Sequence, residues 1–425
     1  MTSAPDSLAR TPGFRPDPRT LFAATAMAAF AYIALFLLWN TFPADLSALY
    51  MAGHLFQTGQ YNLIYAAPDG FFGASPPEWQ PLLPALGLAG QDVLPYVYPP
   101  LWAAVMAPLS ALGPQGFFQA AALVELALLM ASVWLAWRLC RSFAIPFWAW
   151  ALTGTVLLGT SVISFTALMH LQPQIVVVFL TLLAFERYST GQSRLAGTLL
   201  GLAAMLKLAP AGLVLIFLLD RNWRALGGFA VTCAVLGGLG LALTGVGLHL
   251  EFLSSMAAAG DGLFITSITY SADLLLHGLA AALDLVPPLD ADARNFRVPD
   301  AGLAVAIAGK ALLVAALIWT VAGTARLPDS HRLPARLLAF SLLINLFGPL
   351  GWVHYYLPQL LLLPALIGLL PRFGGAVLLA LVGTLTSWPL LMLLRTEIHG
   401  DFAIAAMGTA TMALLFIAVV RLARA

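Results

Sequence analysis

The chain has 425 residues, of which 61% are hydrophobic and only 9% are charged, and its formal net charge is +1. Soluble domains contain roughly 45–50% apolar and about 25% charged residues, so this composition excludes an ordinary soluble globular protein. The small net charge does not indicate nucleic-acid or acidic partners. Cys140 and Cys233 fall in or beside apolar segments, so no disulfide framework is expected.

Apolar segments long enough to cross about 30 Å of hydrocarbon recur along the chain. The first, residues 21–38, is interpreted as an uncleaved span after a polar tail of residues 1–20. A polar loop from Thr41 to about Tyr98 follows and contains no Lys or Arg. The short apolar segment 101–112 then predicts a helix that lies in or dips into the outer leaflet, with a short complete span as the alternative.

The remaining chain predicts a series of spans and one hairpin. Residues 196–219 begin and end near arginines, so they are expected to form a short helical hairpin with its tip at Lys207. The other expected spans are residues 117–137, 146–168, 175–188, 226–247, 303–323, 336–350, 356–370, 374–393 and 402–420. We therefore predict an all-α polytopic membrane protein with about 12 transmembrane helices, built as a single domain over residues 21–425.

The basic residues predict the orientation, because Lys and Arg near span ends resist translocation. Of the 20 basic residues, 15 fall on one side of the membrane if both termini are cytoplasmic, the exceptions being Lys207, Arg294, Arg297, Lys310 and Arg395. The non-cytoplasmic loops are then residues 39–100, 169–174, 248–302, 351–355 and 394–401. Most of the reactive side chains lie in these loops, which suggests a site on that face.

Asp45 is the strongest candidate for a catalytic residue, because it follows the first span within a few residues. A carboxylate at the lipid boundary could act as a general base on an acceptor hydroxyl if partial desolvation raises its pKa. The alternative is a charge that ends a helix and lies among the lipid headgroups.

Lys207 and His354 are candidate phosphate contacts. A lysine in mid-membrane costs roughly 2.5–3.5 kcal/mol, which favours a partner such as a phosphate, although its long side chain could also reach the interface. His354 lies among aromatic residues that a membrane-interface belt explains, but the belt does not explain the histidine. Gln172 and Gln174 flank Pro173 and could hydrogen-bond a sugar, or simply form a turn.

The sequence gives no motif for a metal centre, a P-loop or a dinucleotide site, so no cofactor and no metal are expected. A nucleotide sugar would be available only on the cytoplasmic face. A donor outside the cytoplasm must therefore be carried by lipid.

Several blocks together resemble a known family. Asp45, the aromatic Gly59-Gln60-Tyr61-Asn62-Leu63-Ile64-Tyr65 and the Tyr98-Pro99-Pro100-Leu101 block resemble the first loop of polyprenol-phosphate-dependent glycosyltransferases of the GT-C superfamily. Gln172-Pro173-Gln174, the Gly197-to-Pro210 block with Lys207, and Trp352-Val353-His354-Tyr355-Tyr356 look like glycosyltransferase family 87, the polyprenol-phosphate-mannose-dependent α-mannosyltransferases. The likeness covers roughly residues 20–370, and it departs where the family usually has Gly-Gln-x-Asn and this chain has Leu171-Gln172-Pro173-Gln174.

The resemblance implies a GT-C-type fold with juxtamembrane helices in the first loop, in a bacterial plasma (inner) membrane. It implies inverting transfer of a sugar, mannose in the family, from a polyprenyl phosphate to a lipid-linked or glycan hydroxyl on the non-cytoplasmic face. Asp45 takes the position of the catalytic base and His354 that of a histidine near the donor phosphate, where Lys207 also fits. Gln172, Gln174, Tyr98 and Tyr355 are the expected sugar or acceptor contacts.

Two other classes share the lipid solvent and a similar ligand. A transporter or flippase of a lipid-linked sugar would commonly show a repeat, and none is evident in the two halves. An O-antigen-type ligase or polymerase would use a diphosphate donor, which should require more cationic residues in the outer loops than the three arginines present.

Overall fold

The computed structural model describes residues 17–68, 71–260, 262–298, 302–348 and 350–422. Of the expected N-terminal tail, residues 1–16 lie outside this range. The helices of the first half are α1 Pro18–Leu38, α2 Ala44–Gln57, α3 Pro100–Ser110, α4 Gly113–Leu139, α5 Phe147–Thr160, α6 Val162–Met169, α7 Gln174–Ser189, α8 Ser193–Leu206, α9 Val214–Leu219 and α10 Trp223–Gly260.

The second half adds shorter and broken helices and a two-stranded antiparallel ribbon. Its helices are α11 Ala272–Ala282, α12 Leu303–Thr324, α13 Asp329–Leu346, α14 Leu357–Leu362, α15 Leu366–Leu369, α16 Arg372–Leu385, α17 Trp388–Glu397 and α18 Phe402–Leu422. The strands are β1 Leu263–Ile265 and β2 Phe296–Val298. Single 3₁₀ turns are η1 Tyr61–Leu63, η2 Pro77–Trp79, η3 Arg141–Phe143, η4 Ala209–Leu213, η5 Val353–Tyr356 and η6 Leu363–Ala365.

The described residues include five helices long and apolar enough to cross a membrane, namely α1, α4, α10, α12 and α18. The pair α6 and α7, bent by 118°, raises that number to six if the pair is one span. The expectation of a helical, polytopic membrane protein is therefore confirmed. The other expected spans correspond to shorter apolar helices such as α8, whose 14 residues rise only about 21 Å, so the figure of about twelve spans stays a prediction.

Two segments expected as continuous spans, residues 146–168 and 374–393, are each broken in the middle. The breaks lie side by side, and the backbone N–H of Val162 donates to the carbonyl of Thr386 at 2.8 Å. Ser161 caps the new helix end, because its hydroxyl accepts from the amide two residues later. Pairing of the two breaks satisfies backbone groups that an apolar interior would otherwise leave without partners.

Helix α10 packs along α8 through glycines that allow close backbone approach. A Cβ on Gly197 would lie 1.9 Å from the carbonyl oxygen of Ala225, and one on Gly228 would lie 2.3 Å from that of Arg194. At Gly245, where φ is 75°, α10 bends sharply. The helix then continues to Gly260, so the beginning of the segment expected as the 248–302 loop is helical.

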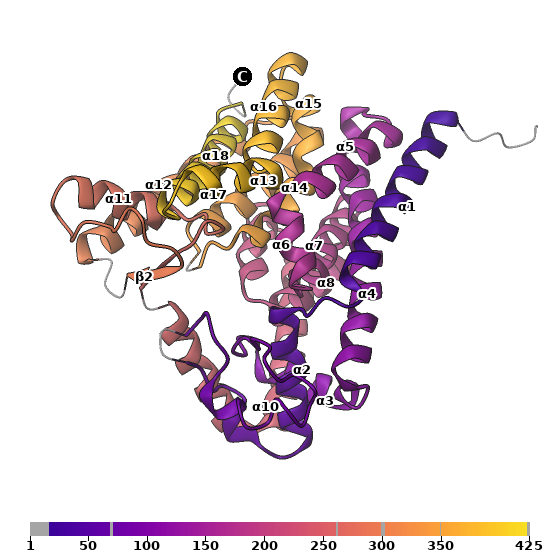
Figure 1. Ribbon diagram of the computed structural model, residues 1–425. Coiled ribbons are helices and arrows are strands. Elements are labelled where there is room, and N and C mark those ends of the chain that lie inside the picture. The colour runs from indigo at the N-terminus through magenta and orange to yellow at the C-terminus, as the bar shows by residue number, and fades with distance from the viewer. Residues whose placement is uncertain (1–16, 69–70, 261, 299–301, 349, 423–425) are drawn as a thin grey trace, which may run out of the picture.

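The helices are arranged with two distinct ends (Figure 1). The start of α1 and the end of α18 lie toward the top of the view, whereas α2, α3 and the bend of α10 lie at the bottom. Several of the arginines used for orientation form salt bridges with acidic residues. Arg138 in the last turn of α4 contacts Glu186 of α7 at 2.6 Å, and Arg336 contacts Asp220 at 2.5 Å. The α6–α7 bend, about 20 Å from Glu186 by helix length, lines the cavity described next.

Candidate active site

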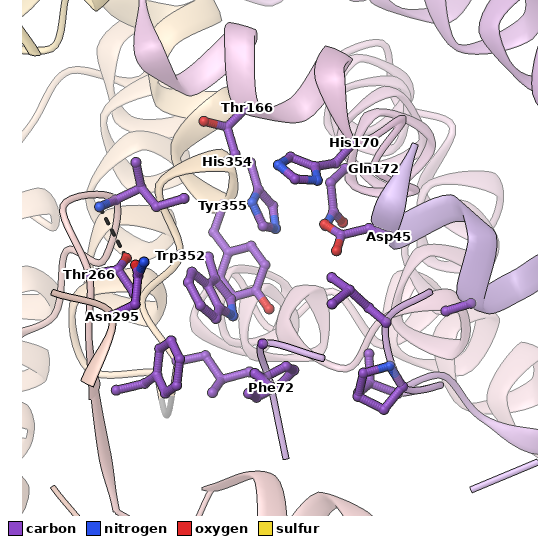
Figure 2. A pocket seen from close by; sticks show the side chains of 18 of the residues that line it. Asp45, Phe72, Thr166, His170, Gln172, Thr266, Asn295, Trp352, His354 and Tyr355 are labelled. Carbon is purple, nitrogen blue, oxygen red and sulfur yellow. Dashed lines mark hydrogen bonds between the residues drawn. The ribbon is translucent and has the colours of Figure 1, made fainter. Parts of the chain in front are cut away.

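A cavity of about 610 Å³ opens where α2, the α6–α7 bend, the end of α8 and η5 meet. Its lining includes six of the seven residues expected to carry the chemistry: Asp45, Tyr98, Gln172, Lys207, His354 and Tyr355. Figure 2 shows Asp45, His170, Gln172 and His354 gathered at one end of this cavity. Residues more than 300 positions apart in the sequence thus meet in one space.

Asp45 lies in the first turn of α2, directly after Pro43 ends the extended link from α1. The position of α2 is fixed against the α6–α7 bend, because the amide of Leu46 donates to the carbonyl of His170 at 3.2 Å. Burial raises the pKa of Asp45 above its usual range, and the interaction with His170 and Lys207 partly offsets this. Asp45 is therefore a stronger base than an exposed aspartate, with two nitrogen-bearing side chains close by.

Lys207 ends α8 in an extended conformation, which breaks the helix where the hairpin tip was predicted. Its Nζ lies 4.2 Å from the centre of the Tyr355 ring, in a cation–π contact. The indole N–H of Trp102 donates to the carbonyl of Met205 at 2.7 Å and ties this end of α8 to α3. The amine of Lys207 therefore lines the same cavity as Asp45, where its charge would lower the pKa of that carboxyl group.

His354 is 4% exposed, and among the described residues neither of its ring nitrogens has a hydrogen-bond partner. Its ring packs edge-on against Tyr355 with centroids 4.7 Å apart. The surrounding backbone is well anchored, because Val353 N–H donates to the carbonyl of Ile268 at 2.8 Å and the Asn345 amide donates to that of Tyr355 at 2.6 Å. Buried polar nitrogens without partners are costly, so this imidazole is suited to a ligand in the cavity.

The α6–α7 bend supplies Gln172 and a histidine that sequence reasoning did not select for the site. Leu171 has a φ of 42°, which turns the chain sharply and directs this segment at the cavity. Among the described residues, Gln172 Oε1 and His170 Nδ1 are buried without hydrogen-bond partners. Gln174 is buried at the start of α7, and it is absent from the described residues that line the cavity. In the sequence, only the proximity of His170 to the Gln172-Pro173 turn indicates that it belongs to the site.

Tyr98 is a buried residue in the wall of the cavity. It is 3% exposed, and burial, together with the nearby Asp45, Tyr355 and Glu125, raises the pKa of its hydroxyl well above the usual range. Glu125, in the middle of α4, is a buried carboxyl that sequence reasoning passed over, and its Oε2 has no hydrogen-bond partner within the described part of the chain. The structure thus adds a second carboxyl behind the wall of the cavity.

The opposite end of the cavity is built mainly from aromatic and uncharged polar side chains. Figure 2 places Phe72, Trp352, Thr266 and Asn295 there, and Phe264 and Arg297 also line this part. Sequence reasoning had noted Arg297 as a cation in an outer loop and Trp352 only as part of a family block. Aromatic residues are abundant in the chain, so their pattern carried no signal for Phe72 or Phe264.

Within the described ranges, no group of three or more His, Cys, Asp or Glu side chains is placed to hold a metal ion. The side chains that line the cavity include one carboxyl group, one lysine, one arginine, two imidazoles, two phenols and two amides. This set can accept a proton at one point and donate hydrogen bonds or positive charge to an anion at another.

The chain is similar in sequence to known glycosyltransferases. The sequence model of glycosyltransferase family 87 matches residues 96–353. A polyprenol-phosphate-mannose-dependent alpha-(1-2)-phosphatidylinositol mannoside mannosyltransferase of Mycobacterium tuberculosis (strain ATCC 25618 / H37Rv) is 28% identical over 307 residues. That alignment covers 68% of this chain and 66% of the relative, so the chain spans just under two thirds of the relative's length. The family match includes Gln172 and Lys207, but it begins after Asp45 and ends one residue before His354.

Proposed function

Because the chain belongs to glycosyltransferase family 87, we propose that it transfers mannose from a polyprenyl-phosphate-mannose donor to a hydroxyl of a lipid-linked or glycan acceptor. The reaction inverts the anomeric centre and takes place in the cavity that contains Asp45. The observation that carries this proposal is the meeting of Asp45, Lys207 and His354 in one cavity, although they come from widely separated parts of the sequence.

The proposed step has one bond formed and one broken. The acceptor oxygen attacks the anomeric carbon of the sugar while the bond from that carbon to the phosphate oxygen breaks. Asp45 takes the proton of the attacking hydroxyl, which its raised pKa favours. The products are the glycosylated acceptor and a polyprenyl phosphate.

The departing phosphate gains negative charge, which side chains in the water-poor cavity must stabilise. Lys207 supplies an amine that can carry positive charge, and His354 supplies a ring N–H that has no partner among the described residues. Preorganised donors of this kind stabilise developing charge more in a water-poor site than in bulk water. Gln172, Tyr98 and Tyr355 are the proposed sugar contacts within the cavity.

We place the site on the non-cytoplasmic face of a bacterial plasma membrane, with both termini in the cytoplasm and about twelve spans. The orientation rests on the absence of Lys and Arg in the first loop and on the clustering of arginines at the other helix ends. A lipid-carried donor is the activated sugar accessible on that face.

Mass spectrometry of glycolipids from a strain that lacks the protein tests this function. We expect one glycolipid or glycan to accumulate with one hexose fewer and to regain that hexose when the gene is restored. An unchanged set of glycolipids, together with a lipid-linked sugar retained on the cytoplasmic leaflet, would instead support a transporter.

A further inference from the structure

The end of the cavity away from Asp45 contains a cluster of three aromatic rings from three different segments. Phe72 comes from the first loop, Phe264 from β1, and Trp352 from the residue before η5. The ring centroids are 6.0 Å apart for Phe72 and Phe264, 5.8 Å for Phe72 and Trp352, and 5.5 Å for Phe264 and Trp352. All three side chains are only half-buried and line the cavity, so each presents apolar surface to a ligand.

The β1–β2 ribbon adds a polar edge to this cluster. In its register, Phe264 is paired directly with Arg297 across the two strands. Arg297 Nη2 donates to the carbonyl of Ala258 at 3.1 Å, which ties the ribbon to the end of α10. The backbone N–H of Asn295 donates to the carboxylate of Asp401 at 2.9 Å, which ties the ribbon to the start of α18. The ribbon thus holds aromatic and hydrogen-bonding side chains on one wall of the cavity.

The two ends of the cavity are suited to different ligand groups. Asp45, His170, Gln172 and His354 gather at one end of the cavity (Figure 2), so this is the end suited to proton transfer and phosphate binding. The other end offers aromatic surface with a few polar groups, which is the composition of a site for a neutral, ring-shaped ligand with hydroxyls on its rim. A pyranose has apolar C–H faces and hydroxyls around its edge.

We propose that Phe72, Phe264 and Trp352, with Asn295 and Arg297 at their edge, form the acceptor subsite and bind a pyranose ring of a glycan acceptor. This inference rests on the proposed function and adds the side chains that bind the acceptor sugar and the end of the cavity that they occupy. The rings stack against the C–H faces of the acceptor sugar, and the polar edge hydrogen-bonds its hydroxyls. A hydroxyl on the side facing Asp45 is then presented to the base.

The test compares Michaelis constants for the two substrates. The donor is labelled polyprenyl-phosphate-mannose. The acceptor is a glycolipid extract from a strain that lacks the protein, and its concentration is varied. For Phe264→Ala and Phe72→Ala we expect the apparent KM for the extract to rise about tenfold, with the KM for the donor unchanged. Arg297→Gln should also raise the acceptor KM, by a smaller factor.

Matched controls separate the subsite from general damage. Phe373→Ala removes the same ring from an exposed position on α16, and Arg372→Gln removes the same charge from an exposed position at the start of that helix. Both should leave the acceptor KM unchanged. Phe264→Tyr keeps the ring and should retain most of the acceptor affinity, which covers the case in which the alanine variants fold poorly.

A rise in donor KM alone, or unchanged constants in the ring variants, would overturn the inference. Loss of acceptor affinity in Phe264→Tyr equal to that in Phe264→Ala would do the same. If the wild-type protein itself transfers no label to any lipid in the extract, the proposed function fails instead, so the two failures are distinguishable.

Discussion

Replacement of Asp45 by asparagine removes the proposed base while it keeps the size and polarity of the side chain. Asp45 lies in the first turn of α2 and faces the cavity, and the backbone contacts that hold this turn use Leu46 N–H and the carbonyl of His170 rather than the carboxylate. The helix and the cavity should therefore keep their shape. The loss should fall on the chemical step.

The expected size of the effect follows from the role. General-base catalysis contributes about 10²- to 10⁴-fold, which corresponds to roughly 3–5 kcal/mol of activation free energy. We expect Asp45→Asn to lower kcat by that factor, with the KM for the donor within about threefold of wild type. Transfer of labelled mannose from polyprenyl-phosphate-mannose to lipid extract, followed over time with purified protein in liposomes, measures both constants.

The matched control is Asp92→Asn, the same substitution at an exposed position of the same loop. It should retain wild-type transfer. If Asp45→Asn also retains wild-type kcat, Asp45 is not the base, and another group must take the proton of the acceptor hydroxyl. A raised donor KM with unchanged kcat would indicate that Asp45 binds the donor instead.

Three further predictions concern pH, phosphate binding and orientation. Ionised Asp45 is the active form, so the rate should rise with pH through its raised pKa. Lys207→Gln removes a charge that lowers the pKa of Asp45, so the acid limb of the pH–rate profile should move to higher pH. A shift to lower pH would contradict this assignment. His354→Ala should lower kcat about 10²- to 10³-fold, as loss of one charge-stabilising donor does, and kcat near wild type would remove His354 from the site. In a variant without the two native cysteines, a cysteine at exposed Asp92 should react with an impermeant maleimide in intact cells, and one at exposed Gln192 only after permeabilisation; the opposite pattern would reverse the orientation.

The sequence predicted the long helices well because lipid imposes their length and apolarity. Residues 21–38, 303–323 and 402–420 correspond closely to α1, α12 and α18. The same reasoning missed the breaks near Ser161 and Thr386. They are stabilised by a backbone hydrogen bond between positions more than 200 residues apart, and an apolar segment carries no record of such pairing.

The candidate site was predictable where a residue type conflicts with its surroundings. Asp45, Lys207 and His354 each place a polar or charged group beside apolar segments, and the structure brings all three to one cavity. Phenylalanine is common in the apolar segments of a membrane protein, so only the contact between Phe72 and Phe264 in the folded structure distinguishes them from the other phenylalanines.

The most direct test of the central claim supplies purified wild-type protein in liposomes with labelled polyprenyl-phosphate-mannose and acceptor extract, in parallel with labelled GDP-mannose. The account predicts transfer of mannose to a glycolipid from the polyprenyl donor only, with an anomeric configuration opposite to that of the donor. Transfer from GDP-mannose, retention of configuration, or movement of the intact donor across the bilayer without transfer would contradict it.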